Sequence, residues 1–244
     1  MGLTTSNPVI IGIVDSGCGF ARSAKTGVER VIAAQGFKYD QGVVLTPASD
    51  DQLGHGSALL EVMATQAPAA SFAIAQIFHE RLSTTPAQVA AAIDWLVEQK
   101  VDLINLSLGL RNDRELLRIA CEKAIAAGVI ICASSPAKGD PVYPSAYPGV
   151  FRMTGDARCE NLAQLSCLKT QYADFGGYVK AANGVIGASA GCAQLTGHIG
   201  RYLSQGGKAE QAAVDHWLES QASYFGVEVR FPVAQAARNE GAEE

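Results

Sequence analysis

The segment VAAAIDWLVEQKVDLINLSLGLRNDRELLRIACEKAIAAGVIICASS, residues 89–135, alternates helical patterns with short apolar runs, and this alternation determines the fold class. In its first helical pattern, apolar residues recur at intervals of three and four and therefore lie on one helix face. These residues are Val89, Ala92, Ile93, Leu96 and Val97. The same spacing recurs over Leu117–Ile125. The runs Leu103–Leu106 and Val129–Ala133 are short, mainly apolar and rich in Ile, Leu or Val, as expected of strands buried on both faces.

Two earlier runs, Pro8–Val14 and Ser71–Phe78, have the same character and extend the alternation toward the N-terminus. Strands that alternate with helices in this way form parallel sheets with right-handed crossovers. The sequence therefore predicts an α/β fold, with a doubly wound, mostly parallel sheet and helices on both faces.

Local signals mark the ends of the predicted helices. Asn112 or Asp113 can cap the second helix, and Gly128 can end it before the next strand begins. The pattern later becomes irregular until a helix expected over about 189–203. A last helix, over about 208–220, is expected to pack outside the sheet.

The composition describes a globular protein large enough for one substantial core. The 244 residues are 48% hydrophobic and 18% charged, with a mean hydropathy of +0.11. One domain over residues 1–235 is the simplest interpretation, followed by a polar, acidic tail over residues 236–244. The formal net charge of −5 gives no attraction to phosphate backbones or anionic membranes, so no nucleic-acid partner is expected.

The beginning of the chain, MGLTTSNPVIIGIVD, has no sign of a secretion signal. It lacks a basic segment, a separate apolar segment and a cleavage site of small residues. No apolar run approaches the roughly 18 to 20 residues needed to span a bilayer. We therefore expect a cytoplasmic protein with no membrane association.

Six cysteines are scattered without the paired spacing that is typical of zinc sites: Cys18, Cys121, Cys132, Cys159, Cys167 and Cys192. Reduced and mostly buried thiols are the simplest interpretation. No metal site and no organic cofactor are predicted.

Chemically distinctive segments follow three of the predicted strands: Asp15-Ser16-Gly17, Ser107-Leu108-Gly109 and Ala133-Ser134-Ser135. In open parallel sheets the carboxyl ends of the strands lie at one edge, and ligands bind there. We therefore expect the three segments to share one cleft.

Asp15, His55 and Ser189 are the residue types that a catalytic triad needs. Asp15 follows a very apolar strand, where an unpaired carboxylate would be costly, so a histidine partner would explain it. His55 stands between two glycines, ahead of the helical run ALLEVMATQA. Ser189 lies among small residues, GASAGCA, where a following helix could hold it and its backbone N–H could face a developing oxyanion.

Each of the three residues also has a simpler interpretation when it is taken alone. Asp15 could be a strand-end or phosphate-binding carboxylate, His55 a structural histidine, and Ser189 a helix N-cap. Structural or surface roles are expected for the other histidines, His79, His198 and His216.

Five ordered blocks of the sequence resemble the subtilisin-like serine peptidases. VIIGIVDSG resembles the block that holds the family's aspartate, and GHGSALLEVMA resembles its HGT block, with serine in place of threonine. AIDWLVEQKVDLINLSLG is similar to the helix and strand that lead to the substrate-binding edge. YPSAYPGVFRMTG is similar to the YPA…PGVIAVGA stretch, and GASAGCAQLTG to the serine block GTSMAAPHVAG. The resemblance covers about residues 9–203, and the order aspartate, histidine, serine is that of subtilisin.

This resemblance implies a serine endopeptidase that works through an acyl-enzyme, with Asp15, His55 and Ser189 as its triad. It also implies that residues on two strand ends flank the bound peptide: Ser107, Leu108, Gly109, Ala133, Ser134 and Ser135. The first three would hydrogen-bond the peptide as an added strand.

The chain departs from the family pattern just after the run Val129–Ala133. Where the family has an asparagine whose amide donates to the oxyanion, this chain has Pro136, which lacks both that side chain and a backbone N–H. Loss of that donor lowers turnover in subtilisin by about 10² to 10³. We expect a slow enzyme unless Lys138, Asn183 or a substrate group replaces the donor. Ser135 replaces a family glycine, which favours a small residue before the cleaved bond.

The aspartate block begins almost at the first residue, so no propeptide is expected, and narrow specificity would protect the cell from an active peptidase. Small proteins of this kind resemble leader peptidases that mature ribosomally made, modified peptides, such as the one for the crosslinked small subunit of quinohemoprotein amine dehydrogenase. The resemblance implies a peptide or protein precursor as the substrate, with its modifying enzymes as further partners.

Two other functions stay open. Pro136 motivates a catalytically impaired subtilisin-like fold that acts as a peptide-binding or scaffold module. An unrelated α/β protein could bind a small anionic ligand near Asp15, although no complete glycine-rich phosphate motif follows that strand.

Overall fold

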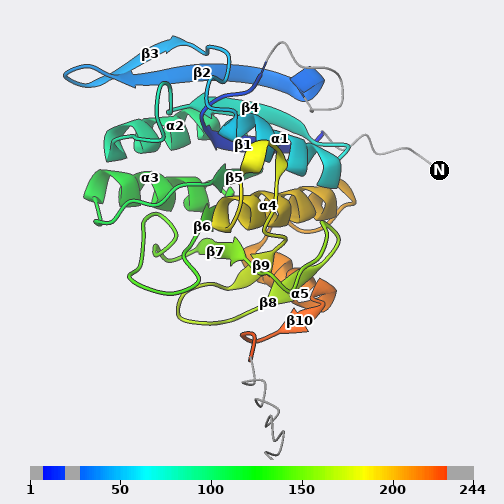
Figure 1. Ribbon diagram of the computed structural model, residues 1–244. Helices are drawn as coiled ribbons and strands as arrows, with labels where there is room; N and C mark the ends of the chain where they lie inside the picture. The colour runs from blue at the N-terminus through cyan, green and yellow to red at the C-terminus, as the bar shows by residue number, and fades with distance from the viewer. Residues whose placement is uncertain (1–7, 20–27, 230–244) are drawn as a thin grey trace, which may run out of the picture.

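The structure is a computed structural model that describes residues 8–19 and 28–229. Figure 1 shows a twisted sheet running through the molecule, with helices on both sides. Within the described residues the strand order is β10-β8-β9-β7-β6-β5-β1-β4-β2-β3. Neighbouring strands are parallel, except that β2 pairs antiparallel with β3, and β8 with β9. The predicted mostly parallel α/β sheet is confirmed.

The four strands expected from the sequence form the middle of the sheet: β1 (Ile10–Asp15), β4 (Ser71–Gln76), β5 (Leu103–Leu106) and β6 (Ile130–Ser134). β5 lies between β1 and β6, and all of its residues are buried. These strands are apolar on both faces because helices cover both faces.

Between residues 28 and 229, six further strands flank this centre and were not predicted: β2 (Val31–Tyr39), β3 (Val43–Pro47), β7 (Val150–Gly155), β8 (Leu165–Cys167), β9 (Phe175–Gly177) and β10 (Tyr224–Phe225). β3 is the last strand on its side of the sheet and is largely exposed, so it has no long apolar run. β8, β9 and β10 have only two or three residues each, too few for a periodic pattern.

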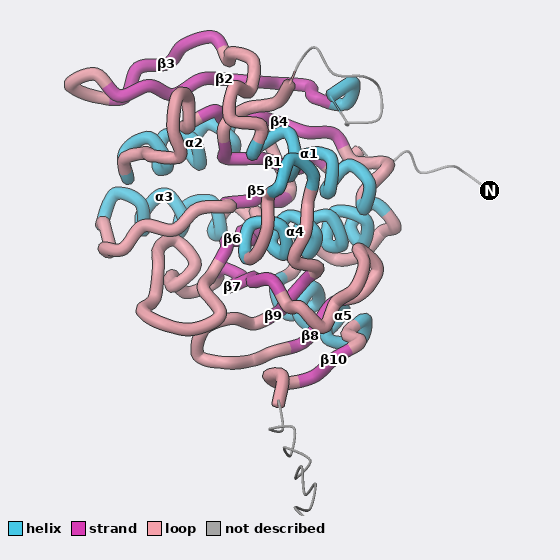
Figure 2. The backbone as a smooth tube through the Cα atoms, viewed as in Figure 1, coloured by secondary structure: helices cyan, strands magenta, loops and turns pink. Residues whose placement is uncertain are grey.

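In the described part of the chain the helices α1 to α5 cover the sheet, and Figure 2 shows them in cyan. One face carries α1 (His55–Gln66), α4 (Ala188–Ser204) and α5 (Gln211–Gln221), whose apolar side chains share one buried cluster. The opposite face carries α2 (Pro86–Glu98) and α3 (Glu115–Ala126), which share a second cluster. The short 3-10 helices are η1 (Val28–Arg30) and η2 (Ala182–Gly184).

The predicted cap of α3 is wrong, and the predicted end is right. The N-cap residue is Arg114, which makes no side-chain cap. The Asp113 carboxylate accepts a hydrogen bond from the Tyr147 hydroxyl at 2.7 Å instead of capping the helix. Gly128, at φ 86°, follows the end of α3 and allows the turn into β6. The last helix begins at Gln211, three residues later than expected.

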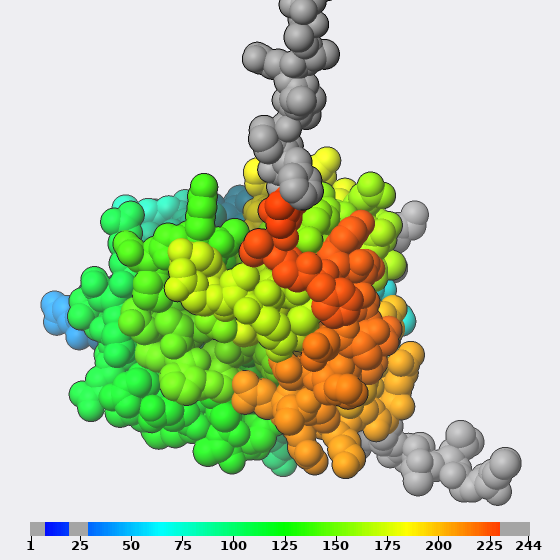
Figure 3. Space-filling view, turned by 90° about the horizontal axis from the view of Figure 1, so that it is seen from below, coloured from blue at the N-terminus to red at the C-terminus, as the bar shows by residue number. Residues whose placement is uncertain are grey.

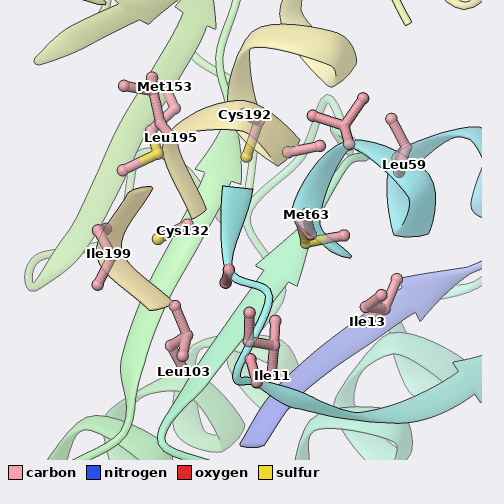
Figure 4. Packing of buried hydrophobic residues seen from close by; sticks show 14 of the residues in the cluster. Ile11, Ile13, Leu59, Met63, Leu103, Cys132, Met153, Cys192, Leu195 and Ile199 are labelled. Carbon is pink, nitrogen blue, oxygen red and sulfur yellow. The ribbon is translucent and has the colours of Figure 1, made fainter. Parts of the chain in front are cut away.

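Figure 4 shows the core between the sheet, α1 and α4, to which β1 contributes Ile11, α1 contributes Leu59 and Met63, and α4 contributes Leu195. Figure 3 shows the orange-to-red segment of α5 and β10 covering the molecule beside the yellow-green chain of β8 and β9. All six cysteines are free and buried, which confirms the predicted reduced thiols.

No helix among the described residues is long and apolar enough to cross a bilayer. The predicted acidic tail over 236–244 lies outside the described residues, as do the first seven residues of the segment examined for a secretion signal.

Candidate active site

Asp15 and His55 are held together at the carboxyl end of β1. Asp15 is the last residue of β1 and is fully buried, and His55 is the first residue of α1. His55 Nδ1 lies 2.7 Å from Asp15 Oδ1. An ionised carboxylate can only accept hydrogen bonds, so Nδ1 carries the proton and Nε2 keeps a lone pair. This tautomer suits His55 to accept a proton from a hydroxyl group.

The two oxygens of Asp15 have very different surroundings. Oδ1 accepts from Ser16 N at 2.7 Å and Ser16 Oγ at 3.2 Å as well as from His55. Oδ2 is buried and has no hydrogen-bond partner within the described chain. An unsatisfied buried acceptor costs about 1–3 kcal/mol, and native proteins tolerate such groups mainly at functional sites.

Opposing effects act on the pKa of His55. Burial lowers this pKa. The hydrogen bond and negative charge of Asp15, together with the charge of Asp51, raise it by more than burial lowers it. The pKa therefore lies above the ordinary value of 6.5.

Glycines let the chain around His55 approach β1. A Cβ atom at Gly56 would overlap the carbonyl oxygen of Gly17 and contact Asp15 Cβ at 3.3 Å. Gly56 N donates instead to Ser16 Oγ at 2.8 Å. Gly54 precedes His55 with a left-handed φ of 71°, which favours glycine.

Ser189 is the second residue of α4, and its hydroxyl is half-buried at the end of β5. Ser189 Oγ lies 3.5 Å from the Ser107 carbonyl oxygen, and Ser107 Oγ lies 3.5 Å from the Ser189 carbonyl oxygen. A Cβ atom at Gly191 would overlap the Thr154 carbonyl, so the first turn of α4 packs directly on the backbone of β7. The N-cap of α4 is Gly187, so the interpretation of Ser189 as an N-cap is wrong.

β1 and β5 are neighbouring parallel strands, with Val14 opposite Leu106. His55 therefore contacts the end of one strand, and Ser189 the end of the next. The structure brings all three predicted triad residues to one edge of the sheet.

The two segments predicted to flank a peptide also lie side by side. β5 and β6 pair in parallel with Leu106 opposite Ala133, and Ser134 Oγ donates to the Leu108 carbonyl at 3.4 Å. A Cβ atom at Gly109 would lie 2.9 Å from Val142 Cγ2, in the loop after β6. Both segments thus leave the sheet at the edge where Ser189 lies.

A cavity of about 750 Å³ opens next to Ser135 and Pro136. Tyr143, Tyr147 and Tyr172 contribute to its lining. Ser135 Oγ donates to the Tyr172 carbonyl at 2.7 Å, so this side chain is fixed at the wall. A volume of this size and an aromatic lining are typical of ligand sites.

Within the described chain, neither side chain predicted as a substitute oxyanion donor forms a hydrogen bond to the segment around Pro136. Asn183 Nδ2 donates to the Gly54 carbonyl at 3.1 Å, on the His55 side of the site. Lys138 is exposed in the loop after β6. Replacement of the oxyanion donor by either residue stays a prediction.

Two polar residues that support the site were not predicted: Asp51 and Asn105. Asn105 is fully buried, and its Nδ2 donates to Thr196 Oγ1 at 2.9 Å and Cys192 Sγ at 3.3 Å, on α4. Its Oδ1 accepts from Ser107 Oγ at 2.9 Å. A lone amide inside an apolar strand, LINL, was the signal that could have identified it.

Comparison with known proteins agrees with this geometry. The model of the family described as the subtilase family matches residues 6–154, which include Asp15 and His55. The minor extracellular protease Epr of Bacillus subtilis is 27% identical over 177 residues, covering 68% of this chain and 26% of Epr. The chain spans about half or less of the length of several curated relatives that it matches.

Solved structures show the same fold. The S41 psychrophilic protease superposes with a TM-score of 0.65 at 19% identity, covering 87% of this chain and 82% of that one. The prenylagaramide maturation protease PagA superposes with a TM-score of 0.61 at 13% identity, covering 86% of this chain and 82% of that one.

Proposed function

The chain belongs to the subtilase family, and from this membership we propose that it is a serine endopeptidase whose catalytic triad is Asp15, His55 and Ser189. The observation that carries the proposal is the hydrogen bond of 2.7 Å between Asp15 Oδ1 and His55 Nδ1. It joins a buried carboxylate to an imidazole at the end of β1, beside the strand end that Ser189 contacts.

In the proposed reaction, His55 Nε2 takes the proton of Ser189 as Oγ attacks the peptide carbonyl. Asp15 holds the ring in the required tautomer and stabilises the imidazolium. His55 then returns the proton to the leaving amine, and an acyl-enzyme remains on Ser189. A water molecule, deprotonated by His55, hydrolyses the acyl-enzyme and regenerates the serine.

The Ser189 N–H, at the N-terminus of α4, supports the proposal as one donor to the oxyanion. Pro136 supplies no second donor, so the proposed enzyme is slow unless Lys138, Asn183 or a substrate group replaces that donor. Slow turnover is compatible with processing a small number of precursor molecules.

The two segments after β5 and β6 are the proposed binding site for the substrate backbone. Ser107-Leu108-Gly109 pairs with the peptide as an added strand, and Ala133-Ser134-Ser135 borders the residue before the cleaved bond. The preference for a small residue there rests on Ser135. Efficient cleavage after large aromatic residues would contradict this preference. A comparison of substrates with small and large residues at this position is informative because a cavity lies beside Ser135.

The proposed substrate is a leader-bearing precursor of a ribosomally made, modified peptide, cleaved in the cytoplasm beside its modifying enzymes. The prenylagaramide maturation protease PagA shares the fold and thereby lends support to this substrate class. The precursor of the small subunit of quinohemoprotein amine dehydrogenase is the specific candidate.

Labelling with a fluorophosphonate probe tests the triad. The wild-type protein is expected to become labelled on Ser189, because an activated hydroxyl attacks the phosphorus. Ser189→Ala should abolish labelling and cleavage while circular dichroism and thermal unfolding stay close to the wild type. Equal labelling of both proteins would refute the assignment of Ser189.

Incubation with leader-bearing precursors, followed by mass spectrometry, tests the substrate class and locates the cleaved bond. Cleavage at the leader junction by the wild type, and none by Ser189→Ala, is the expected result. Cleavage of unrelated denatured proteins at many sites, with intact leader junctions, would contradict narrow specificity.

The second candidate is a peptide-binding or scaffold module with an impaired triad, favoured by Pro136. It predicts peptide binding without probe labelling and without cleavage. Calorimetric titration of Ser189→Ala with the precursor, compared with labelling of the wild type, separates the two functions.

A further inference from the structure

The helix that begins with His55 has an unusual N-terminus. Its N-cap residue is Gly54, which has no side chain to bond the free N–H groups of the first turn. The cap comes from three residues earlier. Asp51 Oδ2 accepts from Ser57 N at 2.9 Å and from Ser57 Oγ at 2.6 Å.

The other oxygen of the same carboxylate fixes the turn that leads into the helix. Asp51 Oδ1 accepts from Gly54 N at 2.8 Å and from Leu53 N at 3.1 Å. One side chain therefore ties both sides of His55, the turn before it and the helical residue two positions after it. Because His55 stands between these anchors, the direction of its side chain depends on them.

Asp51 is charged in this position. Burial would raise its pKa, but hydrogen bonds from Ser57 and Gly54 hold the pKa below its ordinary value of 3.8. A carboxylate at a helix N-terminus is also stabilised by the helix dipole. The negative charge of Asp51 therefore persists through the pH range in which His55 titrates.

We propose that Asp51 is a positioning residue of the active site, which fixes the backbone that presents His55 and adds a second negative charge to its surroundings. This inference rests on the proposed function of His55 as general base. It extends that function, because the affinity of His55 for a proton then depends on a residue outside the triad.

Among the described residues, few charged groups face His55, which limits the residues that can change its affinity for a proton. β1 contributes Asp15 in direct contact, and the turn before α1 contributes Asp51, with Asp50 as its exposed neighbour. η2 and the first turn of α4, in the part of the chain that the structure describes, bring only uncharged residues: Ala182, Asn183, Gly184, Ala188, Ser189 and Ala190.

Asp51→Asn removes the charge but keeps an acceptor oxygen, Asp51→Ala removes both, and Asp50→Asn removes a matched charge from the adjacent exposed position. NMR titration of the His55 ring is made in the Ser189→Ala background, so it requires no activity. Asp51→Asn is expected to lower the His55 midpoint by about half a unit, as one charge acting through a high dielectric would. Asp50→Asn is expected to shift it less.

The kinetic test uses probe labelling at a pH where His55 is neutral in every variant. There Asp51→Ala is expected to label at least about tenfold more slowly, the loss expected for a misoriented base, and Asp51→Asn should recover part of the rate. If both Asp51 variants titrate and label like Asp50→Asn while only their thermal midpoints fall, Asp51 is merely a helix cap and the proposal is overturned. A wild type that is never labelled refutes the proposed function, whereas the NMR shift still decides the effect of Asp51.

Discussion

At the scale of single residues, the protonation state of His55 determines when Ser189 can be activated. The neutral ring accepts the serine proton, and its pKa lies above 6.5 because the hydrogen bond and charge of Asp15 outweigh the effect of burial. Probe labelling is therefore expected to rise with pH through a midpoint above 6.5 and then level off. The labelling rate as a function of pH measures this midpoint.

Asp15→Asn provides the matched test of that pH profile. It removes the charge that stabilises the imidazolium and favours the wrong tautomer, which in a serine protease costs about 10⁴ in turnover. Labelling is expected to fall by a similar order and not to recover at high pH. A variant that labels at the wild-type rate would show that the contact between Asp15 and His55 is structural only.

The buried cysteines give a second prediction at this scale. Burial, with a smaller contribution from nearby acidic groups, raises the pKa of Cys18 and Cys121 to about 12, and burial also raises the pKa of Cys132 to about 12. Thiols with such pKa values react slowly, because the thiolate is the nucleophile. A thiol reagent at pH 8 is expected to modify the native protein much more slowly than the unfolded protein, in which all six cysteines react. Rapid modification of the native protein would contradict the burial.

The ordered resemblance of their sequence blocks to the subtilisin-like peptidases led to the prediction of Asp15, His55 and Ser189 as a triad, whereas the residues that orient them needed coordinates. Asp15 stood out because an acid follows an apolar strand. Asp51 did not, because an acidic residue in a polar loop is common and its cap spans six positions to Ser57. Sequence patterns report the chemistry of a residue more readily than the contacts that orient it.

At the scale of elements, the position of α4 depends on its close approach to β7. A methyl group at Gly191 would overlap the Thr154 carbonyl, so Gly191→Ala must displace the first turn of the helix together with Ser189. A loss of about 1–3 kcal/mol in the free energy of unfolding is expected, which is typical of overpacking. The labelling rate should also fall under conditions in which the variant is still fully folded, because Ser189 is displaced.

Gly42→Ala is the control for this substitution. No atom lies within 4 Å of the position where its Cβ would stand, in the turn between β2 and β3. Stability and labelling are expected to match the wild type. Chemical denaturation of both variants measures the difference, and equal stability of Gly191→Ala and Gly42→Ala would show that α4 packs less tightly than described.

The elements differed in how far the sequence could predict them. The central strands and the helices α2, α3 and α4 have clear apolar periods, because one or both faces are buried along their length. The end of α1 at Gln66 agrees within one residue with the helical run ALLEVMATQA, but the contacts that hold this end could not be predicted. There Arg30 donates to the carbonyl oxygens of Ala64, Ala67, Pro68 and Ala70, and no local pattern links an arginine to carbonyls 34 to 40 residues later.

At the scale of the whole molecule, strand order determines which side chains meet. The rule that parallel strands share a carboxyl edge predicted one cleft for Asp15, Ser107 and Ser134. It did not predict that β1 lies between β4 and β5, which places Asp15 next to Ser107. That arrangement depends on how the two helix layers pack against opposite faces of the sheet, and periodicity contains no information about it.

His198, on α4, links the stability of the whole molecule to pH. It is 1% exposed, and its Nε2 lies 2.9 Å from the Leu162 carbonyl. Burial, together with the positive charge of Arg201, lowers its pKa to about 4 although the Leu162 carbonyl favours the charged form. Between about pH 6.5 and 4 the unfolded chain therefore binds more protons at this histidine than the folded chain. The free energy of unfolding must fall as the pH decreases through that range, by up to about 3 kcal/mol.

His198→Gln tests this linkage, because glutamine can keep a donor toward Leu162 but does not titrate. The wild type is expected to lose stability from pH 6.5 to 4, and the variant to lose distinctly less, as measured by denaturant unfolding at each pH. His55 acts with the opposite sign: its raised pKa gives stability that is present below pH 6.5 and is lost as the pH rises through the folded value, so it cannot produce the acid loss. Asp51 and Asp156 have lowered pKa values, so the stability that they contribute is lost only below about pH 4.

The matched control is His216→Gln, at an exposed position on α5, which should keep the wild-type slope of stability against pH. An unchanged slope in His198→Gln would place the acid sensitivity elsewhere in the molecule.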